Sequence, residues 1–372
     1  MTLKSISRRM LLSLSLLPLL ICGCTDVKQI NRITFVTALG VEKSEVGVKV
    51  HAVLAIPNRF SALSPGGTGG NQKSPNYILT EEGRDVSEAL FKMKRDNSRD
   101  IQFGHNKIIL FSEEIAKDGL DPYLDLFMRR SEFQPIAWIA LTKDSPRDVL
   151  ETVPQIPDST ADLFIDVFSQ AGTETAEILP IYLYEFYSLS VEPGQTPFAM
   201  YVQNLQGGNH IEIGQLGVFR GDKLVGSITS EETMYLQMLQ NNPLHNTIID
   251  VPDATAMALN YKTTIHATNQ GINISLHMDL DIDELHGQHI STPTEVSSLE
   301  REITEELEQN VSRLVKKLQA MHADPAGIGN EYRKHLSGVL LDYEAWNQDI
   351  FPEIPVTVTA RTKIVRRGTI EY

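Results

Sequence analysis

Cysteine is almost absent from this chain of 372 residues, which contains only Cys22 and Cys24. A disulfide between two cysteines one residue apart would close a very tight ring, and a redox pair would need two intervening residues. Without disulfides, the chain depends on packed hydrophobic cores for its stability. About 350 residues follow the first 23, which is more than one core usually holds, so we expect two to three domains.

Long apolar runs are also missing after residue 23, where no stretch approaches about 18 residues, so we expect no second membrane crossing. A shorter run comes before the cysteines, since Met10–Ile21 is uncharged and follows Lys4, Arg8 and Arg9. A basic start and a short apolar segment are typical of a secretory signal peptide, because a membrane-spanning helix needs about 20 apolar residues.

The end of this run, Ile21-Cys22-Gly23-Cys24, has the pattern of a bacterial lipoprotein signal. An aliphatic residue, a small residue and glycine precede the cysteine that receives the lipid. We therefore predict a signal peptide over residues 1–23 and a mature chain that starts at Cys24 with S-diacylglycerol and N-acyl groups. The alternative is a secreted protein with a stray cysteine. Each buried CH₂ contributes about 0.8 kcal/mol, so the acyl chains would hold the protein on the outer face of a membrane.

Positive charge is scarce as well. The sequence has 33 Lys and Arg against 48 Asp and Glu, a net charge of −15. Residues 1–23 contain three basic residues and no acidic ones, so the mature chain would have a net charge of −18. This acidity disfavours nucleic acid as a partner and also flat docking on anionic lipid, because both require a basic surface.

Catalytic signatures are missing, since the sequence has no G-x-S-x-G elbow and no H-E-x-x-H zinc motif. His286 and His289 are spaced as a metal pair, but no Cys or third His lies close enough in sequence to complete a site. We expect no enzyme and no cofactor. Four neighbouring aromatic residues could stack on a sugar, but they are explained more simply as core and edge residues of one element: Tyr182, Tyr184, Phe186 and Tyr187.

Three alternating carboxylates, Asp279, Asp281 and Asp283, resemble the start of a calcium-binding loop. Such a loop requires Gly at its sixth position and a bidentate Glu at its twelfth, where this sequence has Glu284 and Ile290. We therefore interpret the three carboxylates as the wet face of a strand and expect no metal site.

Strands often follow one another directly in this sequence, which indicates antiparallel hairpins. The β-rich stretches 33–41 and 46–56 predict the first hairpin, and 211–228 and 254–285 predict two more. A further strand is expected over 102–111.

Helices are expected between these strands. The longest has Thr292 as N-cap and Glu295 three residues later, followed by apolar residues at spacings of three and four from Val296 to Met321. Its opposite side is polar, which predicts packing of one face on a sheet. A shorter helix is expected to have Asp121 as its N-cap.

Hairpins with helices on one side define an α+β fold, with two to three domains of mainly antiparallel sheets and helices packed on them. The segment 191–197 contains two prolines and a glycine and forms a natural break. We therefore place an N-terminal domain over residues 24–200 and a C-terminal domain over residues 201–372.

Four stretches, in order, carry a family resemblance: CTDVKQINRITFVTALGVEK from Cys24, QFGHNKIILFSEEIAKDGLDPYLDLFMRRSEF from Gln102, GQLGVFRGDKLVGSIT from Gly214 and DPAGIGN from Asp324. Together with the long helix, Trp346 and Gly368, they resemble the Ger(x)C lipoproteins over essentially the whole mature chain. These are the C subunits of nutrient germinant receptors in endospore-forming bacteria. The family usually has Trp, Glu and Asp at the positions where this sequence has Thr25, Gln29 and Glu42, respectively. These departures leave the subfamily and the choice of partner open.

The resemblance implies a lipid-anchored receptor subunit on the extracytoplasmic face of the inner spore membrane, required for the germination response to nutrients. Its partners would be an integral-membrane A subunit, a transporter-like B subunit and, through acylated Cys24, the lipid bilayer. One alternative is an extracytoplasmic solute-binding lipoprotein of a transporter, which would have two α/β lobes with repeated βαβ units. A lipoprotein hydrolase is another, and the missing catalytic motifs argue against it.

Overall fold

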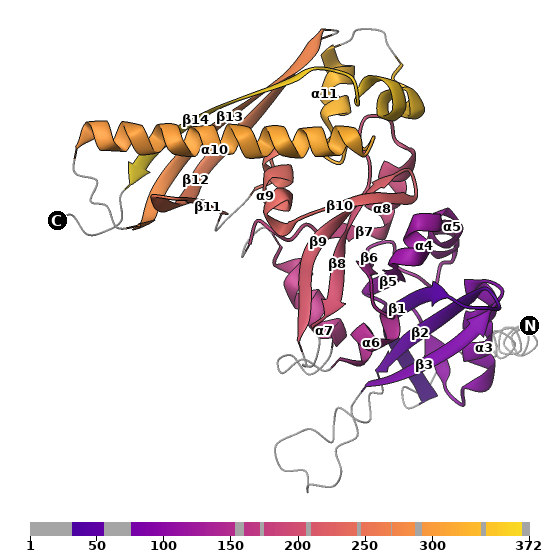
Figure 1. Ribbon diagram of the computed structural model, residues 1–372. Coiled ribbons are helices and arrows are strands. Elements are labelled where there is room, and N and C mark those ends of the chain that lie inside the picture. Colours follow the sequence, from indigo (N-terminus) through magenta and orange to yellow (C-terminus); the bar gives the residue numbers. More distant parts are fainter. Residues whose placement is uncertain are drawn as a thin grey trace, which may run out of the picture.

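The computed structural model describes residues 32–55, 76–152, 160–171, 175–205, 210–243, 247–268, 270–286, 292–335 and 340–366. These residues form a ten-stranded sheet and a four-stranded sheet, with helices packed on both (Figure 1). The expected α+β fold, with more than one layer of sheet and helix, is confirmed.

The ten-stranded sheet has the order β10-β9-β8-β6-β5-β1-β2-β3, with β4 beside β1 and β7 beside β6. Two of the expected hairpins are present, because β1 pairs antiparallel with β2 and β9 pairs antiparallel with β10. The strands are β1 (Ile33–Lys43), β2 (Val48–Ala55), β3 (Asn76–Gly83), β4 (Asp100–Gln102), β5 (Ile108–Ser112), β6 (Trp138–Thr142), β7 (Ile181–Tyr182), β8 (Phe198–Asn204), β9 (Ile211–Arg220) and β10 (Lys223–Ile228).

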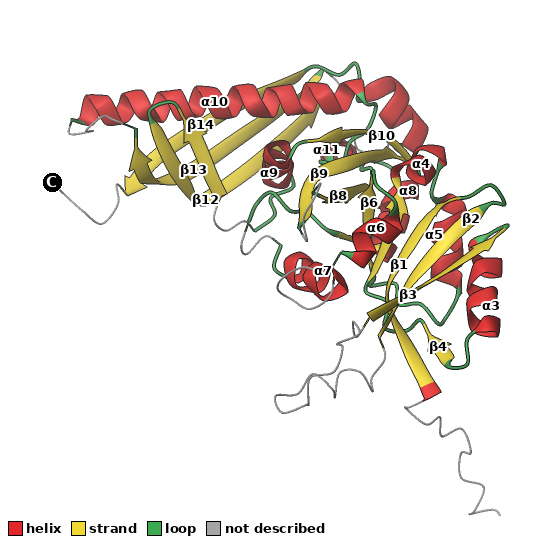
Figure 2. Cartoon of the chain, turned by 60° about the horizontal axis from the view of Figure 1, so that its bottom comes forward, coloured by secondary structure: helices red, strands yellow, loops and turns green. Residues whose placement is uncertain are grey.

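The centre of this sheet is parallel, which the hairpin pattern did not predict. β1 pairs with β5, β5 with β6, and β6 with β8, all in parallel, whereas antiparallel pairs form the two flanks. Every residue of β5 and β6 is buried, as expected for parallel strands that helices cover on both faces. Figure 2 shows these helices around the sheet: α3 (Val86–Asp96), α4 (Glu113–Asp118), α5 (Asp121–Arg129), α6 (Pro146–Glu151), α7 (Thr160–Ser169), α8 (Leu183–Val191) and α9 (Ser230–Leu239).

Two local expectations are corrected. The strand expected over 102–111 is divided into β4 and β5, because a turn in which the Asn106 N–H donates to the Phe103 carbonyl (2.9 Å) interrupts it. The N-cap expected at Asp121 is Leu120. Asp121 instead lies in the first turn of α5, where its N–H donates to the Asp222 carboxylate (3.0 Å).

The four-stranded sheet consists of β11 (Thr247–Val251), β12 (Ala254–Thr268), β13 (Gly271–Leu285) and β14 (Val356–Arg366), in that order. β12 and β13 are the hairpin expected over 254–285, and β14 is added in parallel to β13. The long helix α10 (Pro293–Ala320) runs along the sheet in Figure 1. Between α10 and β14 come α11 (Ile328–His335) and a π-helical turn, Ala345–Ile350.

α10 confirms the long helix predicted from the sequence. The Thr292 hydroxyl accepts from the Glu295 N–H (3.3 Å), and the Glu295 carboxylate accepts from the Thr292 N–H (2.9 Å). This capping box satisfies two backbone donors at the start of the helix. The predicted apolar side chains from Val296 to Leu318 are buried, and Met321 is half-buried.

α10 also covers the outer edge of β14. The Glu308 carboxylate accepts from the Ala360 N–H (2.7 Å), and the Glu300 carboxylate accepts from the Ile364 N–H (2.9 Å). Unpaired backbone donors on an edge strand can form hydrogen bonds with a strand of another chain. The two glutamates occupy these donors, so the helix shields the edge of the sheet as well as packing against it.

The domain boundary expected between residues 200 and 201 falls within β8, and β9 and β10 continue the first sheet. The division into residues 24–200 and 201–372 therefore stays a prediction. Of the helices in the described part of the chain, none is long and apolar enough to cross a membrane.

Candidate functional site

Cys24, the predicted lipidation site, lies outside the described residues, together with Cys22 and the whole predicted signal peptide over 1–23. The same is true of His289. Acylation of Cys24 therefore stays a prediction.

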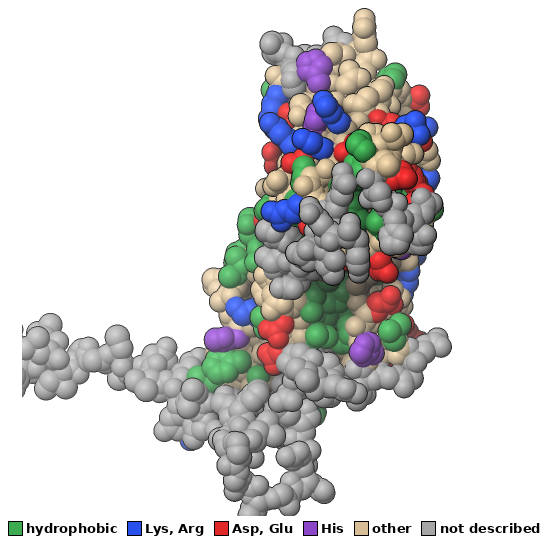
Figure 3. All heavy atoms as spheres, turned by 90° about the vertical axis from the view of Figure 1, so that its left-hand side faces the viewer, with side chains coloured by type: hydrophobic (Ala, Val, Ile, Leu, Met, Phe, Trp, Pro, Cys, Tyr) green, Lys and Arg blue, Asp and Glu red, His purple; other side chains and the backbone are tan. Residues whose placement is uncertain are grey.

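The three alternating carboxylates lie on β13, where Asp283 is exposed and Asp279 and Asp281 are half-buried. The strand register places Lys363 beside Asp279. His286 follows the strand and makes hydrogen bonds with a hydroxyl and a backbone carbonyl (3.1 and 3.2 Å). Among the described residues, no three His, Cys, Asp or Glu side chains gather as metal ligands. Figure 3 shows basic and acidic side chains intermixed over the upper part of the molecule.

The four aromatic residues considered as a stacking platform divide between core and surface. Phe186 is buried, and Tyr182 is half-buried and stacks on Trp138 (ring centroids 5.5 Å apart). Tyr184 stacks on Tyr182 (5.9 Å, 16° between the planes) and keeps 43% of its surface exposed, while Tyr187 keeps 36%. They belong to β7 and α8, so the expectation that they share one element is corrected.

A buried carboxylate, that of Asp324, organises the junction between the two sheets. Its Oδ1 accepts from the Ile328 N–H (3.1 Å), and its Oδ2 accepts from the Gly329 N–H (2.8 Å) and from the Trp346 Nε1–H (3.1 Å). Burial raises the pKa of Asp324 to about 6, although these donors favour the ionised form and oppose the shift. One side chain therefore holds the start of α11 and the π-helical turn together.

Two chain segments, 194–196 and 324–330, are hydrogen-bonded to each other beside this carboxylate. The Thr196 N–H donates to the Asp324 backbone carbonyl (2.9 Å), and the Asn330 N–H donates to the Gly194 carbonyl (3.1 Å). Gly194 has φ = +100°, and a Cβ added at Gly329 would lie 2.6 Å from the Gly194 Cα. Glycine at both positions permits this approach of the two backbones. The segment between α8 and β8 is thereby fixed to the segment before α11.

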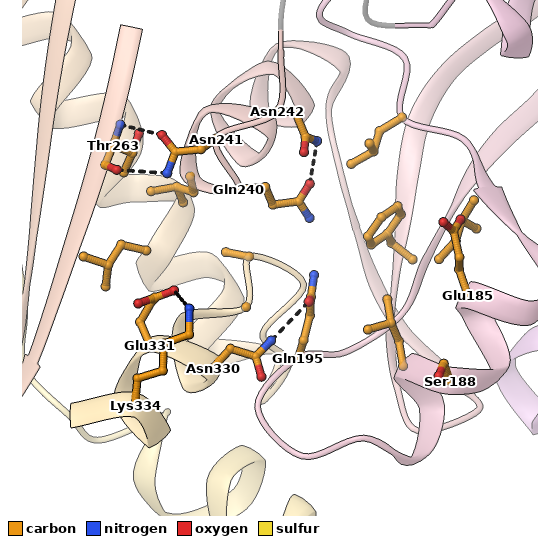
Figure 4. A pocket seen from close by; sticks show the side chains of 18 of the residues that line it. Glu185, Ser188, Gln195, Gln240, Asn241, Asn242, Thr263, Asn330, Glu331 and Lys334 are labelled. Atoms are coloured by element: carbon orange, nitrogen blue, oxygen red, sulfur yellow. Dashed lines mark hydrogen bonds and ion pairs between the residues drawn. The ribbon is translucent and has the colours of Figure 1, made fainter. Parts of the chain in front are cut away.

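A cleft of about 910 Å³ opens beside this junction, between elements of the two sheets. One wall comes from β7 and α8 and includes Tyr184, Glu185 and Ser188. The opposite wall comes from β12 and α11 and includes Thr263 and Glu331, and the end of α9 lies between the two walls (Figure 4). The volume lies within the range of about 300–1,000 Å³ that is typical of ligand sites.

Side-chain amides form a connected chain along the cleft (Figure 4). The Asn242 amide donates to Gln240 Oε1 (2.8 Å), and the Asn330 amide donates to Gln195 Oε1 (3.3 Å). Gln240 and Gln195 both donate to the Pro325 carbonyl, at 2.8 and 3.0 Å. Because each amide is held by its neighbour, the polar atoms that face the cleft have fixed positions.

Acidic and basic residues both line the cleft. Glu331 and Lys334 form an ion pair at 2.6 Å. Glu185 accepts from the Tyr182 N–H (3.1 Å) and from a neighbouring phenol (3.0 Å), and Lys262 is exposed on the opposite wall. Glu185, Glu331 and Lys334 are the charged side chains labelled in Figure 4.

No sequence pattern identified Asp324, Gln195 and Gln240 as residues that join the two sheets. The stretch DPAGIGN served only as part of a resemblance, and 191–197 only as a break. A signal was present, because an acidic residue followed by two closely spaced glycines is suited to a carboxylate that caps a turn.

The cleft supplies amide, hydroxyl and carboxylate groups that can form hydrogen bonds. The fold is that of a two-sheet α+β protein with a cleft between the sheets.

The particular family follows from comparison with known proteins. Residues 26–204 match the spore germination protein N-terminal domain, and residues 214–368 match the spore germination B3/GerAC-like C-terminal domain. The chain belongs to the GerAC-like family of spore germination proteins, and the resemblance stated from the sequence is confirmed.

Individual relatives match over nearly their whole lengths. Spore germination protein KC of Bacillus subtilis (strain 168) is 24% identical over 397 residues, with 96% of this chain and 94% of that protein covered. Spore germination protein GerQC of Bacillus cereus is 21% identical over 385 residues, with 96% and 98% covered. The crystal structure of the GerBC protein is similar with a TM-score of 0.52 and 17% identity, over 92% of this chain and 100% of that one, which shows a shared fold.

Proposed function

We propose that this protein is a lipid-anchored subunit of a nutrient germinant receptor in the inner spore membrane. The observation that supports this most strongly is the coverage of the two family domains. Together they extend from residue 26 to residue 368, so the match starts two residues after Cys24. The family domains therefore begin where the predicted mature chain begins.

The anchor would be Cys24, carrying S-diacylglycerol and N-acyl groups. Eight peptide units separate Cys24 from Arg32, the first described residue, and they span at most about 28 Å. Arg32, the residue before β1, would therefore lie within that distance of the bilayer surface. Confinement at the membrane raises the effective concentration of the subunit near its partners.

The partners would be the integral-membrane A subunit and the transporter-like B subunit of the receptor. A subunit of this kind acts through contacts and not through chemistry of its own, and the cleft and junction described above offer noncovalent groups. The alternative of a solute-binding lipoprotein would have two α/β lobes with repeated βαβ units. Parallel crossovers through helices do occur, from β5 to β6 and from β13 through α10 to β14, but each sheet also contains antiparallel hairpins, and the match of both family domains favours the subunit role.

The test uses an epitope-tagged chain produced in sporulating cells. Metabolic labelling with a palmitate analogue should tag the wild type and the matched control Cys22→Ala but leave Cys24→Ala unlabelled. Label that persists in Cys24→Ala would contradict the anchor. Affinity purification from detergent-solubilised spore membranes should recover integral-membrane A and B subunits with the wild type. Recovery of the tagged chain without any integral-membrane partner would contradict the subunit role.

A further inference from the structure

One edge of β12 is only partly covered by its neighbouring strand. β11 pairs with residues Ala254–Ala258 of β12, whereas β12 itself continues to Thr268 and pairs with β13 along its other edge. In the described part of the chain, no strand pairs with residues 259–268 on the β11 side. An unpaired stretch of this kind offers backbone N–H and C=O groups to an added strand.

A side chain already takes the place of a strand partner at this edge. The Asn241 amide nitrogen donates to the Thr263 carbonyl (2.9 Å), and the Asn241 amide oxygen accepts from the Thr263 N–H (2.7 Å) (Figure 4). Asn241 has φ = 55°, a left-handed conformation that asparagine tolerates better than most residues. Both backbone groups of Thr263 therefore point away from β13, toward Asn241 and the cleft that the two residues line.

The next residue with this orientation is Ile265. In an antiparallel strand the backbone groups of alternate residues point to the same side, so the N–H and C=O of Ile265 share the direction of those of Thr263. Among the described residues, neither group of Ile265 has a hydrogen-bond partner. Ile265 also lines the cleft of about 910 Å³. A free backbone donor and a free backbone acceptor thus face a space that an extended chain can enter.

The lining of the cleft suits the side chains and the backbone of such a segment. Figure 4 shows carbon-only side chains on both sides of the cleft. The apolar lining includes Leu179, Ile181, Leu189, Phe198, Leu239 and Ile265. The amides of Gln195, Gln240 and Asn330 are held by their neighbours and offer further donors and acceptors to a peptide backbone.

One charged side chain in the cleft has no oppositely charged partner. Glu331 and Lys334 form an ion pair with each other, whereas Glu185 forms none with any described residue. Glu185 instead accepts from the Tyr182 N–H (3.1 Å) and the Tyr184 hydroxyl (3.0 Å), one bond to each of its oxygens. A carboxylate oxygen has room for a second hydrogen bond, and a Lys or Arg side chain of a ligand would supply it together with the missing positive charge.

From these features we infer that the cleft binds an extended peptide segment of a partner protein, one that contains a Lys or Arg residue. The segment pairs as an added strand with the N–H and C=O of Ile265, and its basic side chain contacts Glu185. Its apolar side chains pack on the apolar lining. This inference deepens the proposed subunit role and rests on it, because it states how a partner chain is held.

The experiment uses the purified chain from residue 24 and a positional-scanning library of capped hexapeptides. We expect selection of Lys or Arg at one position. The selected peptide should bind about tenfold more weakly when its basic residue is replaced by Glu. No selection at any position, or selection of Asp or Glu, would overturn the inference. So would n-butylamine that binds as tightly as the peptide, because a small cation would then be sufficient.

Proline at position 265 tests the backbone pairing. Ile265→Pro removes the outward N–H, and proline is tolerated in an edge strand where the N–H faces away from the sheet. The chain should therefore stay folded by circular dichroism, while the Kd for the selected peptide rises about tenfold. Ile265→Val is the matched control, because it keeps the N–H and a β-branched apolar side chain. Equal binding by the two variants would overturn the inference, as would a dimer of the unliganded chain that Ile265→Pro abolishes.

The charge is tested without any change of the backbone. Glu185→Gln keeps an acceptor for the Tyr182 N–H but removes the charge, so the Kd should rise about tenfold. Glu192→Gln is the matched control, because Glu192 is an exposed glutamate at the end of the same helix that does not line the cleft. Equal losses in the two variants would overturn the inference. These tests require no other receptor subunit, so their failure is distinguishable from a failure to recover A and B subunits from spore membranes.

Discussion

Replacement of Asp324 by alanine should disconnect the junction between the two sheets. Its carboxylate accepts three hydrogen bonds, from two backbone N–H groups at the start of α11 and from the Trp346 indole. Asp324 is completely buried, so water cannot replace the lost acceptor. Each buried donor left unpaired costs about 1–3 kcal/mol. We therefore expect Asp324→Ala to lower the free energy of unfolding by at least about 3 kcal/mol near pH 4.

The pH dependence has a definite sign. Burial raises the pKa of Asp324 from 3.8 to about 6, so between these values the native state holds a proton that the unfolded state has released. The stability that Asp324 contributes is therefore fully present below pH 3.8 and is lost as the pH rises through 6. Two pH units at about 1.4 kcal/mol each amount to about 3 kcal/mol. The deficit of Asp324→Ala relative to the wild type should shrink by that amount toward pH 7.

The two tryptophans allow a local assay of the junction. Trp346 contacts Asp324, and Trp138 lies in the first sheet, so a Trp138→Phe background leaves fluorescence from the junction only. Denaturant unfolding is followed at pH 4 and pH 7 in this background. Asp342→Ala is the control, because Asp342 is an exposed carboxylate that also accepts from backbone N–H groups nearby. A deficit of Asp324→Ala that is the same at both pH values, or no larger than that of the control, would refute the reasoning.

Three further predictions concern other parts of the chain. Burial lowers the pKa of His51, against the opposing effect of Glu42, so its contribution is present above pH 6.5 and lost at lower pH. The stability difference between wild type and His51→Gln should therefore shrink from pH 7 to pH 5, and a growing difference in denaturant unfolding would contradict this. Glu308→Leu removes the acceptor for the Ala360 N–H and should cost about 1–2 kcal/mol, measured by denaturant unfolding, whereas Glu308→Gln should be close to wild type; equal losses would be inconsistent with edge capping. Calorimetric titration with calcium or zinc should reveal no stoichiometric site, and a one-to-one site of micromolar affinity would show that the carboxylates of β13 were misjudged.

The parts of the fold that the sequence predicted are those with local signals. The long helix has its capping box and its spacing of apolar residues within one stretch, from Thr292 to Leu318. The hairpin of β12 and β13 likewise joins neighbouring strands. Such signals depend only on residues close together in the chain, so they survive without knowledge of the rest of the fold.

The parallel pairing at the centre of the first sheet could not be predicted from such local signals. Pairing of β6 with β8 joins strands that are far apart in sequence, and hairpin signals say nothing about the order of such strands. The largely apolar character of β6 was visible, but a short buried run is compatible with several positions in a sheet.

The site was hidden for the same reason. Gln195 and Pro325, which are hydrogen-bonded at the junction, are 130 residues apart in the sequence. Tyr184 and Glu185 were visible as an aromatic cluster and a neighbouring acid, but only the fold places β12 and α11 opposite them. The chemistry of the cleft is therefore a property of the arrangement and not of any single motif.

The most direct test of the receptor-subunit role is germination of spores that lack this protein, in a strain where its receptor alone answers a given nutrient. We predict normal growth and sporulation, a strongly slowed response to that nutrient, and normal germination when cortex lysis is activated directly. The wild-type gene should restore the response, and Cys24→Ala should restore it only in part. Unchanged nutrient germination of the deletion strain would contradict the account.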